Sequence, residues 1–161
     1  NCRRMIESCH TYGVPVVVDP KGTDWTKYAY ADYITPNLKE INQVLAEPIH
    51  NEDRAVEVAA HYVMNRFNIR NVIVTRSEEG LSLIRDDENV HIPTKAQEVF
   101  DVSGAGDTVI AVFAMGLAGG MSPADSAYMA NLAASVVVAK LGTYAVSREE
   151  LMAVLKGEAE K

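Results

Sequence analysis

The chain has 161 residues, of which 48% are hydrophobic and 23% are charged, a composition typical of one globular domain and not of a disordered chain. Its 15 Lys and Arg against 22 Asp and Glu give a net charge of −7, which argues against sequence-independent binding of nucleic acid through its phosphates. The longest apolar run, residues 109–121, is shorter than the roughly 20 residues that a membrane span needs. We therefore expect a soluble, cytoplasmic protein that binds neither nucleic acid nor membranes.

In chain order, the apolar pattern alternates between strands and helices. Continuous apolar runs predict buried strands over residues 14–19, 32–35 and 72–75. Further runs over residues 81–84 and 90–92 predict an antiparallel hairpin, and a run over residues 98–100 predicts a short strand. Helical periodicity and cap signatures predict helices over residues 2–11, 37–46, 52–67, 107–118, 123–141 and 148–155. This order indicates an α/β protein with a mainly parallel sheet.

A glycine-rich segment, DVSGAGDT over residues 101–108, lies between a predicted strand and a predicted helix. Its small residues leave backbone N–H groups uncovered, and the helix N-terminus adds partial positive charge, so the segment suits a phosphate. Asp107 would repel that phosphate unless it has a task, such as taking a proton from an attacking hydroxyl. The alternative is that Asp107 only stabilises the helix dipole. The glycine spacing fits neither a dinucleotide fingerprint nor a G-x-x-x-x-G-K loop.

Asn37 and Glu40 lie three residues apart at the start of a predicted helix, in the segment TPNLKE. At this spacing both side chains can face one ligand, and a carboxylate there can organise a hydrated Mg²⁺, which binds through few protein groups. The same spacing is that of a helix capping box. Ser147 and Glu150 repeat it with no chemistry suggested. Both interpretations, a magnesium site and a cap, stay open.

Two other strand ends carry polar side chains. Lys21 lies in the turn after the first predicted strand, Thr75 is the last residue of the third, and Arg76 follows it. Ligands of open α/β sheets bind beyond the carboxyl ends of the strands. Lys21 is therefore either a phosphate contact or a solvated turn residue, and the other two offer a hydroxyl and a guanidinium.

Together these segments resemble the ribokinase-like family of carbohydrate kinases. DVSGAGDT is similar to the C-terminal signature of the family, and TPNLKE to its N-x-x-E motif. Many relatives have T-x-G where this chain has Thr75, Arg76 and Ser77, a change shared by the branch that phosphorylates D-glycero-β-D-manno-heptose 7-phosphate. Further segments resemble that branch, namely VVVDPKGTDW, ITPNLKE, VTRSEEGLSL, IPTKAQEVFDVSGAGDTV and VAKLGT. The resemblance implies a ribokinase-like α/β fold, with a mainly parallel sheet flanked by helices and an antiparallel hairpin.

The resemblance also implies a role for each candidate residue. Asp107 would be the catalytic base for the C1 hydroxyl of the sugar, and a monovalent cation would lie beside Asp101. The charge on the transferred phosphoryl group would be held by the amides of Gly104, Ala105 and Gly106. ATP and Mg²⁺ would be bound by Asn37, Leu38, Lys39 and Glu40, with Glu40 as the metal ligand and with Lys21 and Thr75 along the phosphate chain. Near the adenine would lie Asn131 and the loop of residues 140–143.

The kinase domain of this family is about twice as long as this chain. We therefore expect residues 1–161 to be its C-terminal, nucleotide-binding half, without the N-terminal half that binds the sugar and through which relatives form homodimers. The expected reaction is the ATP-dependent phosphorylation of the heptose phosphate at C1, for ADP-heptose and lipopolysaccharide-core synthesis. Two alternatives stay open: another sugar kinase of the fructose or ribose type, and a catalytically silent nucleotide-binding fragment.

Overall fold

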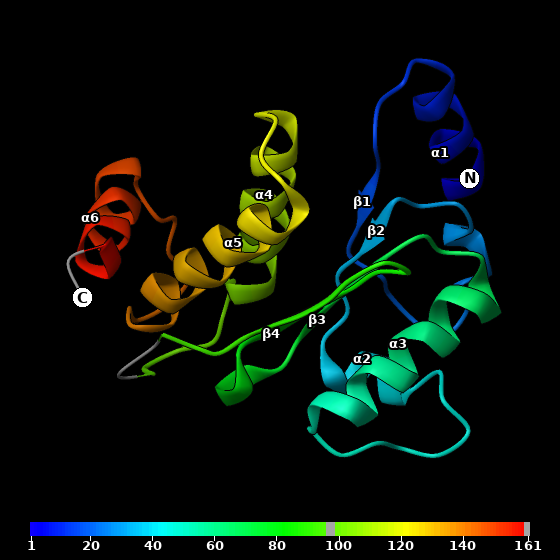
Figure 1. Cartoon of the computed structure of the whole chain (residues 1–161), viewed down its shortest axis with the longest axis horizontal. Coiled ribbons are helices and arrows are strands. Elements are labelled where there is room, and N and C mark those ends of the chain that lie inside the picture. The colour runs from blue at the N-terminus through cyan, green and yellow to red at the C-terminus, as the bar shows by residue number, and fades with distance from the viewer. Residues whose placement is uncertain (96–98, 160–161) are drawn as a thin grey trace. The chain divides into compact units, whose positions relative to one another are not determined.

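The computed structural model describes residues 1–95 and 99–159. The chain divides into two compact units, residues 1–91 and 92–161, whose elements follow one another from blue to red in Figure 1. Strands and helices alternate in the first unit, whereas the described part of the second contains three α-helices. Over both described ranges, no helix is long and apolar enough to cross a membrane.

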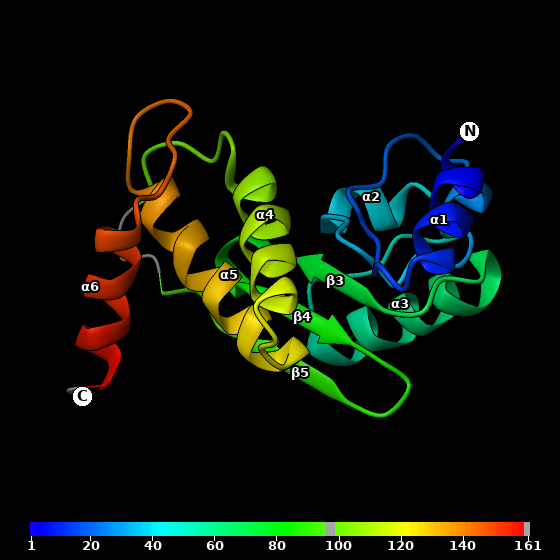
Figure 2. The same ribbon diagram turned by 90° about the horizontal axis from the view of Figure 1, so that it is seen from above.

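A five-stranded sheet organises the first unit, with its strands in the order β1-β2-β3-β4-β5. The strands are β1 (Val17–Val18), β2 (Tyr33–Ile34), β3 (Val72–Thr75), β4 (Leu81–Ile84) and β5 (Asn89–Ile92). The first three run parallel, and β4 is antiparallel to β3. A tight turn, in which Arg85 N–H donates to the Glu88 carbonyl (2.9 Å), joins β4 to its neighbour β5, and β3, β4 and β5 are seen side by side in Figure 2. The predicted α/β class, with parallel strands and a hairpin, is confirmed.

Three α-helices and two short 3₁₀-helices belong to the same unit, the first of them before β1 and the others between strands. They are α1 (Cys2–Thr11), η1 (Thr26–Tyr28), α2 (Leu38–Asn42), α3 (Asp53–Phe67) and η2 (Ser77–Glu79). The apolar face of α3 packs into the core with strand residues such as Ile34 and Val72. Trp25 is fully buried beside Phe67, with their ring centroids 5.8 Å apart. Because the core fixes α3 and the strands, it also fixes the loops at the strand ends.

In the second unit, the helices are α4 (Ala105–Ala118), α5 (Pro123–Val138) and α6 (Arg148–Ala159). The first two pack closely where Gly116 meets Ser126, since a Cβ on Gly116 would lie 2.6 Å from Ser126 Oγ. A glycine is required at this crossing because nothing larger fits. The packing holds the start of α4, and with it the glycine-rich segment.

Several predicted elements end earlier in the structure, because contacts distant in sequence stop them. The helix predicted over 37–46 ends at Asn42, whose side chain accepts from Ile49 N–H (2.9 Å) and donates to its carbonyl (3.3 Å). The helix predicted over 123–141 ends at Val138, whose carbonyl accepts the N–H of Phe100 (2.8 Å).

Other predicted bounds also shift. The first strand, predicted over 14–19, pairs only at Val17–Val18; Pro15 in its first half has no N–H to pair. Of the strand predicted over 98–100, residue 98 lies outside the described residues, and Val99 and Phe100 are not in a strand. Two α-helices are longer than predicted. The helix α4 begins at residue 105 instead of 107, and α6 runs to residue 159 instead of 155.

Candidate active site

Four predicted nucleotide-binding residues meet at the carboxyl ends of β1, β2 and β3. Thr75 N–H donates to the Pro36 carbonyl (3.0 Å), and Thr75 pairs with Asn37 in an isolated parallel bridge. Lys21 Nζ, from the turn after β1, lies 3.0 Å from Glu40 Oε1 in α2. The first unit therefore brings these four residues together at the edge where open α/β sheets bind their ligands.

Asn37 and Glu40 form a complete capping box at the start of α2. Glu40 N–H donates to Asn37 Oδ1 (2.8 Å), and Asn37 N–H donates to Glu40 Oε2 (2.8 Å). The capping role is thus confirmed, but the carboxylate of Glu40 can accept further hydrogen bonds. Among the described residues, Glu40 Oε1 accepts one hydrogen bond, from Lys21, and Oε2 accepts one, from Asn37, whereas a carboxylate oxygen can accept two.

The pair of Lys21 and Glu40 determines how Mg²⁺ can fit here. Hydrogen bonds to Asp19 and then to Glu40 raise the pKa of Lys21, so a cation lies beside the carboxylate. That cation opposes direct coordination, but a Mg²⁺ that keeps most of its waters needs only one or two carboxylates. Among residues 1–95 and 99–159, no three His, Cys, Asp or Glu side chains form a metal-binding cluster. The residues fit a Mg²⁺ held largely through water.

The remaining residues of this edge point in different directions. Lys39 is exposed, whereas the Leu38 side chain packs against the core and leaves only its backbone for a ligand. Arg76, whose guanidinium was expected to face the same edge as Thr75, is buried, with only 2% of its surface exposed. Its guanidinium bonds to Asp53 and Ser82 inside the unit. That expectation is therefore wrong, because the ion pair draws the side chain inward.

In the second unit, Gly104 is the N-cap of α4 and has a φ of 82°, a left-handed conformation that favours glycine. The first helical bond runs from Thr108 N–H to the Gly104 carbonyl (2.9 Å), and Ala105 N–H donates to Val102 (3.2 Å). Within the described ranges, the intervening amides of Gly106 and Asp107 have no acceptor. Such free amides at a helix start, with the helix dipole behind them, suit an anion.

Asp107 is exposed in the first turn of α4, and its carboxylate has no hydrogen bond or ion pair to any residue that the structure describes. Asp125 occupies the equivalent third position of α5, but there Ser122 Oγ donates to its carboxylate (2.7 Å). The Asp125 carboxylate is thus occupied by a cap contact, whereas that of Asp107 has no partner among the described residues. This contrast favours a role for Asp107 beyond the helix dipole.

Asp101 joins the two loops that flank the helix pair. Its carboxylate accepts the N–H of Ser103 (2.8 Å) and that of Gly142 (3.1 Å), which lies 41 residues away. The hydrogen bonds from Ser103, followed by that from Gly142, lower the pKa of Asp101. An ionised carboxylate with spare acceptor capacity fits a monovalent cation. The bond to Gly142 brings the 140–143 loop to the glycine-rich segment, a contact that no sequence spacing signals.

Asn131 has a structural contact in the same unit. It is 6% exposed in α5, and its side-chain amide donates to the Pro93 carbonyl (2.9 Å). The amide oxygen is the part of this side chain that remains for a ligand such as adenine.

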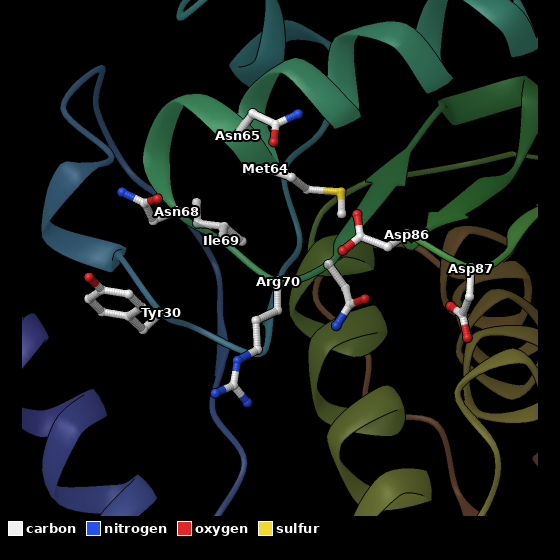
Figure 3. A pocket seen from close by; sticks show the side chains of 9 residues that line it. Tyr30, Met64, Asn65, Asn68, Ile69, Arg70, Asp86 and Asp87 are labelled. Atoms are coloured by element: carbon white, nitrogen blue, oxygen red, sulfur yellow. The ribbon is translucent and has the colours of Figure 1, made fainter.

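A pocket of about 540 Å³ lies at the opposite edge of the sheet (Figure 3). Tyr30 precedes β2, and Arg70 and Asn71 precede β3, so they lie at the amino ends of these strands. The pocket is lined by Tyr30, Met64, Asn65, Asn68, Ile69, Arg70, Asn71, Asp86 and Asp87. It is separate from the edge that carries Thr75 and Asn37, and is not the candidate phosphate site.

Residues 1–150 match the pfkB family of carbohydrate kinases, and the chain belongs to this family. It is 49% identical over 146 residues to the bifunctional protein HldE of Trichlorobacter lovleyi, a match that covers 90% of this chain and 30% of that protein. It is 46% identical over 159 residues to the bifunctional protein HldE of Sodalis glossinidius, with 98% and 33% covered. The chain thus spans about a third of the length of these curated relatives.

Solved structures confirm the ribokinase-like fold. The ribokinase of Thermotoga maritima matches with a TM-score of 0.81 at 30% identity, over 94% of this chain and 52% of that one. The Arabidopsis thaliana ribokinase complexed with ribose and ATP matches with a TM-score of 0.85 at 25% identity, over 95% and 51%. Phosphofructokinase-2 of Escherichia coli in complex with potassium shares the fold, with a TM-score of 0.85 at 17% identity. The chain spans about half of each.

Proposed function

We propose that this chain is the C-terminal, nucleotide-binding half of a kinase domain that phosphorylates D-glycero-β-D-manno-heptose 7-phosphate at C1. Membership of the pfkB family supports ATP-dependent phosphorylation of a sugar. The segments that resemble the heptose branch, and identities of 49% and 46% to proteins named HldE, support the particular substrate. The observation that carries the proposal is the start of α4, where the amides of Gly106 and Asp107 and the carboxylate of Asp107 have no partner within the part of the chain that the structure describes.

In this reaction one bond to phosphorus forms and one breaks. The C1 oxygen of the sugar attacks the γ-phosphorus of ATP, the bond to the bridging oxygen breaks, and ADP leaves. The proton of the C1 hydroxyl passes to Asp107. Gly104, Ala105 and Gly106 offer amides to the transferred phosphoryl group. Because Ala105 N–H already donates to the Val102 carbonyl (3.2 Å), we assign the larger share to the amide of Gly106.

The cluster in the first unit is assigned to the phosphates of ATP. Lys21 supplies positive charge, and Thr75 and Asn37 supply a hydroxyl and an amide at the strand ends. When bound, Mg²⁺ neutralises charge on the phosphates, and Glu40 holds its water shell. The amide oxygen of Asn131 and the 140–143 loop are assigned to the adenine, and Asp101 to a monovalent cation. We also propose, from the resemblance alone, that the full-length enzyme is a cytoplasmic homodimer.

The test is an assay of the full-length protein with ATP and Mg²⁺. Heptose 7-phosphate, fructose and ribose are offered separately, release of ADP is measured, and the product is identified by ³¹P NMR. We expect turnover with heptose 7-phosphate to give the 1,7-bisphosphate. Faster turnover of fructose or ribose would instead support a kinase of those types, which the likeness to two ribokinases favours. Nucleotide binding without turnover of any sugar would indicate a silent nucleotide-binding protein.

A further inference from the structure

Arg76 directly follows Thr75 and carries a charge that the fold buries. Its side chain is 2% exposed and its Nη1 donates to Asp53 Oδ1 (2.6 Å) at the start of α3. The same nitrogen donates to Ser82 Oγ in β4 (3.0 Å). Burying a guanidinium is costly unless it is paired and hydrogen-bonded. An arginine paired in this way is held in one position. Its backbone is bonded directly to Thr75, a residue of the candidate phosphate site.

Asn51 binds Arg76 through both its side chain and its backbone. The Nε of Arg76 donates to Asn51 Oδ1 (2.8 Å) and its Nη2 to the Asn51 carbonyl (3.2 Å). In return, Asn51 Nδ2 donates to the Arg76 carbonyl (3.0 Å). These three bonds fix the backbone of the residue next to Thr75 as well as its side chain. The end of β3 is thereby attached to the loop before α3.

The polar contacts continue across the sheet. Ser82 Oγ lies 2.8 Å from His91 Nδ1, and His91 Nε2 lies 3.0 Å from Glu57 Oε1 in α3. Ser82 is fully buried, whereas His91 and Glu57 are partly buried. The Ser82 hydroxyl is therefore closed to a substrate, and the row acts as a support. It connects β4 and β5 to the same helix that Arg76 binds.

The turn that follows Arg76 contains a strained residue. Ser77 has a φ of 53°, a left-handed conformation that is unfavourable for any residue with a Cβ. It occupies the position where many relatives have the glycine of T-x-G. Strained backbone persists only where the surroundings hold it firmly. Here Arg76 N–H donates to the Gly80 carbonyl (2.8 Å) and closes the turn, while the buried guanidinium anchors its first residue.

We propose that Arg76 is a positioning residue for nucleotide binding. Its bonds to Asp53 and Asn51 hold Thr75 where it meets an ATP phosphate, and keep Ser77 in the turn that relatives make with glycine. This inference rests on the proposed function, because it assumes that Thr75 binds the nucleotide. In this role Arg76 acts through Thr75 and does not itself bind the nucleotide.

The test uses the full-length enzyme and compares Arg76→Met with Arg54→Met. Arg54 follows Asp53 at the start of α3, but its side chain is 84% exposed and pairs with Glu57 alone among the described residues. For Arg76→Met we expect the KM for ATP to rise about tenfold, since loss of one well-placed contact has that scale. The KM for the sugar should stay unchanged. Arg54→Met should change neither constant.

Variants at Asn51 and at Ser77 separate positioning from general stability. Asn51→Ala should raise the KM for ATP as Arg76→Met does, and the double variant should be no worse than either single one, because both changes break the same connection. In the Arg76→Met background, Ser77→Gly should restore the KM for ATP to within about threefold, since glycine adopts the turn without support. Ser77→Ala, which keeps the Cβ, should not restore it.

Other outcomes overturn the inference. A lowered melting temperature with an unchanged KM for ATP in Arg76→Met would make Arg76 purely structural. If Arg76→Met does not fold, Arg76→Lys keeps the charge and loses the planar fork, and an unchanged KM for ATP in that variant has the same meaning. Absence of ATP-dependent activity in the wild-type enzyme would instead refute the proposed function, and this inference with it.

Discussion

Lys21 Nζ lies 3.0 Å from Glu40 Oε1, although the two residues are 19 positions apart. They meet because the turn after β1 and the start of α2 after β2 lie at the same edge of the parallel strands. With the lysine 67% exposed, such a pair adds little to stability. We infer that it balances charge at the phosphate site, since Lys21 can turn to a phosphate while Glu40 turns to the water shell of Mg²⁺.

The first prediction separates the two roles of Glu40. Glu40→Gln keeps an acceptor at the third helical position and can still cap α2, but it removes the charge that attracts Mg²⁺. We expect the Mg²⁺ concentration for half-maximal activity to rise about tenfold or more, with the melting temperature nearly unchanged. Titration of activity with Mg²⁺ at saturating ATP measures this.

Glu150→Gln is the matched control for this prediction. Glu150 forms the equivalent capping box with Ser147 at the start of α6 (Ser147 N–H to Glu150 Oε2, 3.0 Å). Its substitution should leave the Mg²⁺ requirement as it is. An equal Mg²⁺ requirement in Glu40→Gln and wild type would show that Glu40 is a capping residue alone.

The second prediction concerns the start of α4. Apart from its chain neighbours and the backbone of its own helix, no atom of the described residues lies within 4 Å of a Cβ placed on Gly106, so Gly106→Val should fold. The added methyl groups would occupy the space that an anion needs beside the free amides. We expect affinity for ATP, measured by calorimetry, to fall at least tenfold. Gly157→Val in α6, where a Cβ also meets no atom of another described segment, is the control. Undiminished affinity in Gly106→Val would argue against the anion site.

The sequence predicts elements well where short-range patterns determine them. The bounds of α1 and β3 match the apolar patterns over residues 2–11 and 72–75. The end of α2 does not follow from its own periodicity, because the side chain of Asn42 bonds to Ile49, seven residues later. Contacts of this kind depend on where the chain returns, and no local pattern encodes them.

The same distinction applies to the candidate site. The capping box of Asn37 and Glu40 and the loop before Asp107 each lie within one helix start, so their spacing in sequence is enough to predict them. The inward turn of Arg76 depends on Asp53, 23 residues earlier in the chain. Only the arrangement of α3 against β3 reveals that this arginine cannot face the ligand.

The third prediction is a pH dependence at α6. Hydrogen bonds from the Ser147 amide and then from the Tyr144 hydroxyl lower the pKa of Glu150 from 4.5 to about 2. A group whose pKa is lower in the folded state stabilises that state above its unfolded pKa, and the effect is lost as the pH falls through the folded pKa. The contribution should therefore be complete above about pH 4.5 and gone near pH 2.

Thermal unfolding of the wild type and of Glu150→Gln, followed between pH 6 and pH 2, measures this contribution. The difference between their melting temperatures should shrink steadily below about pH 4.5. Glu149→Gln, one residue earlier in the same helix, should follow the wild type throughout. A difference that is constant with pH would show that ionisation of Glu150 does not support α6.

The last prediction concerns Asp107 in the full-length enzyme. Asp107→Asn keeps the shape of the side chain and its place in the first turn of α4, but removes the proton acceptor. We expect ATP to bind as well as in the wild type or more tightly, because a negative charge near the phosphates is gone. The kcat should fall by roughly 10²–10⁴, the scale of general base catalysis. Steady-state kinetics with heptose 7-phosphate and calorimetry with ATP measure the two effects separately.

Asp125→Asn is the matched control, since Asp125 stands at the same third position of α5 and binds Ser122 (2.7 Å). A contribution to the helix dipole is common to both residues, so it should affect both variants alike, by about 1 kcal/mol of stability or less. Only a proton acceptor for the sugar hydroxyl explains a loss of kcat in one variant and not in the other. If Asp107→Asn turns over the heptose phosphate within a few-fold of the wild type, Asp107 is a dipole residue and the base must lie elsewhere.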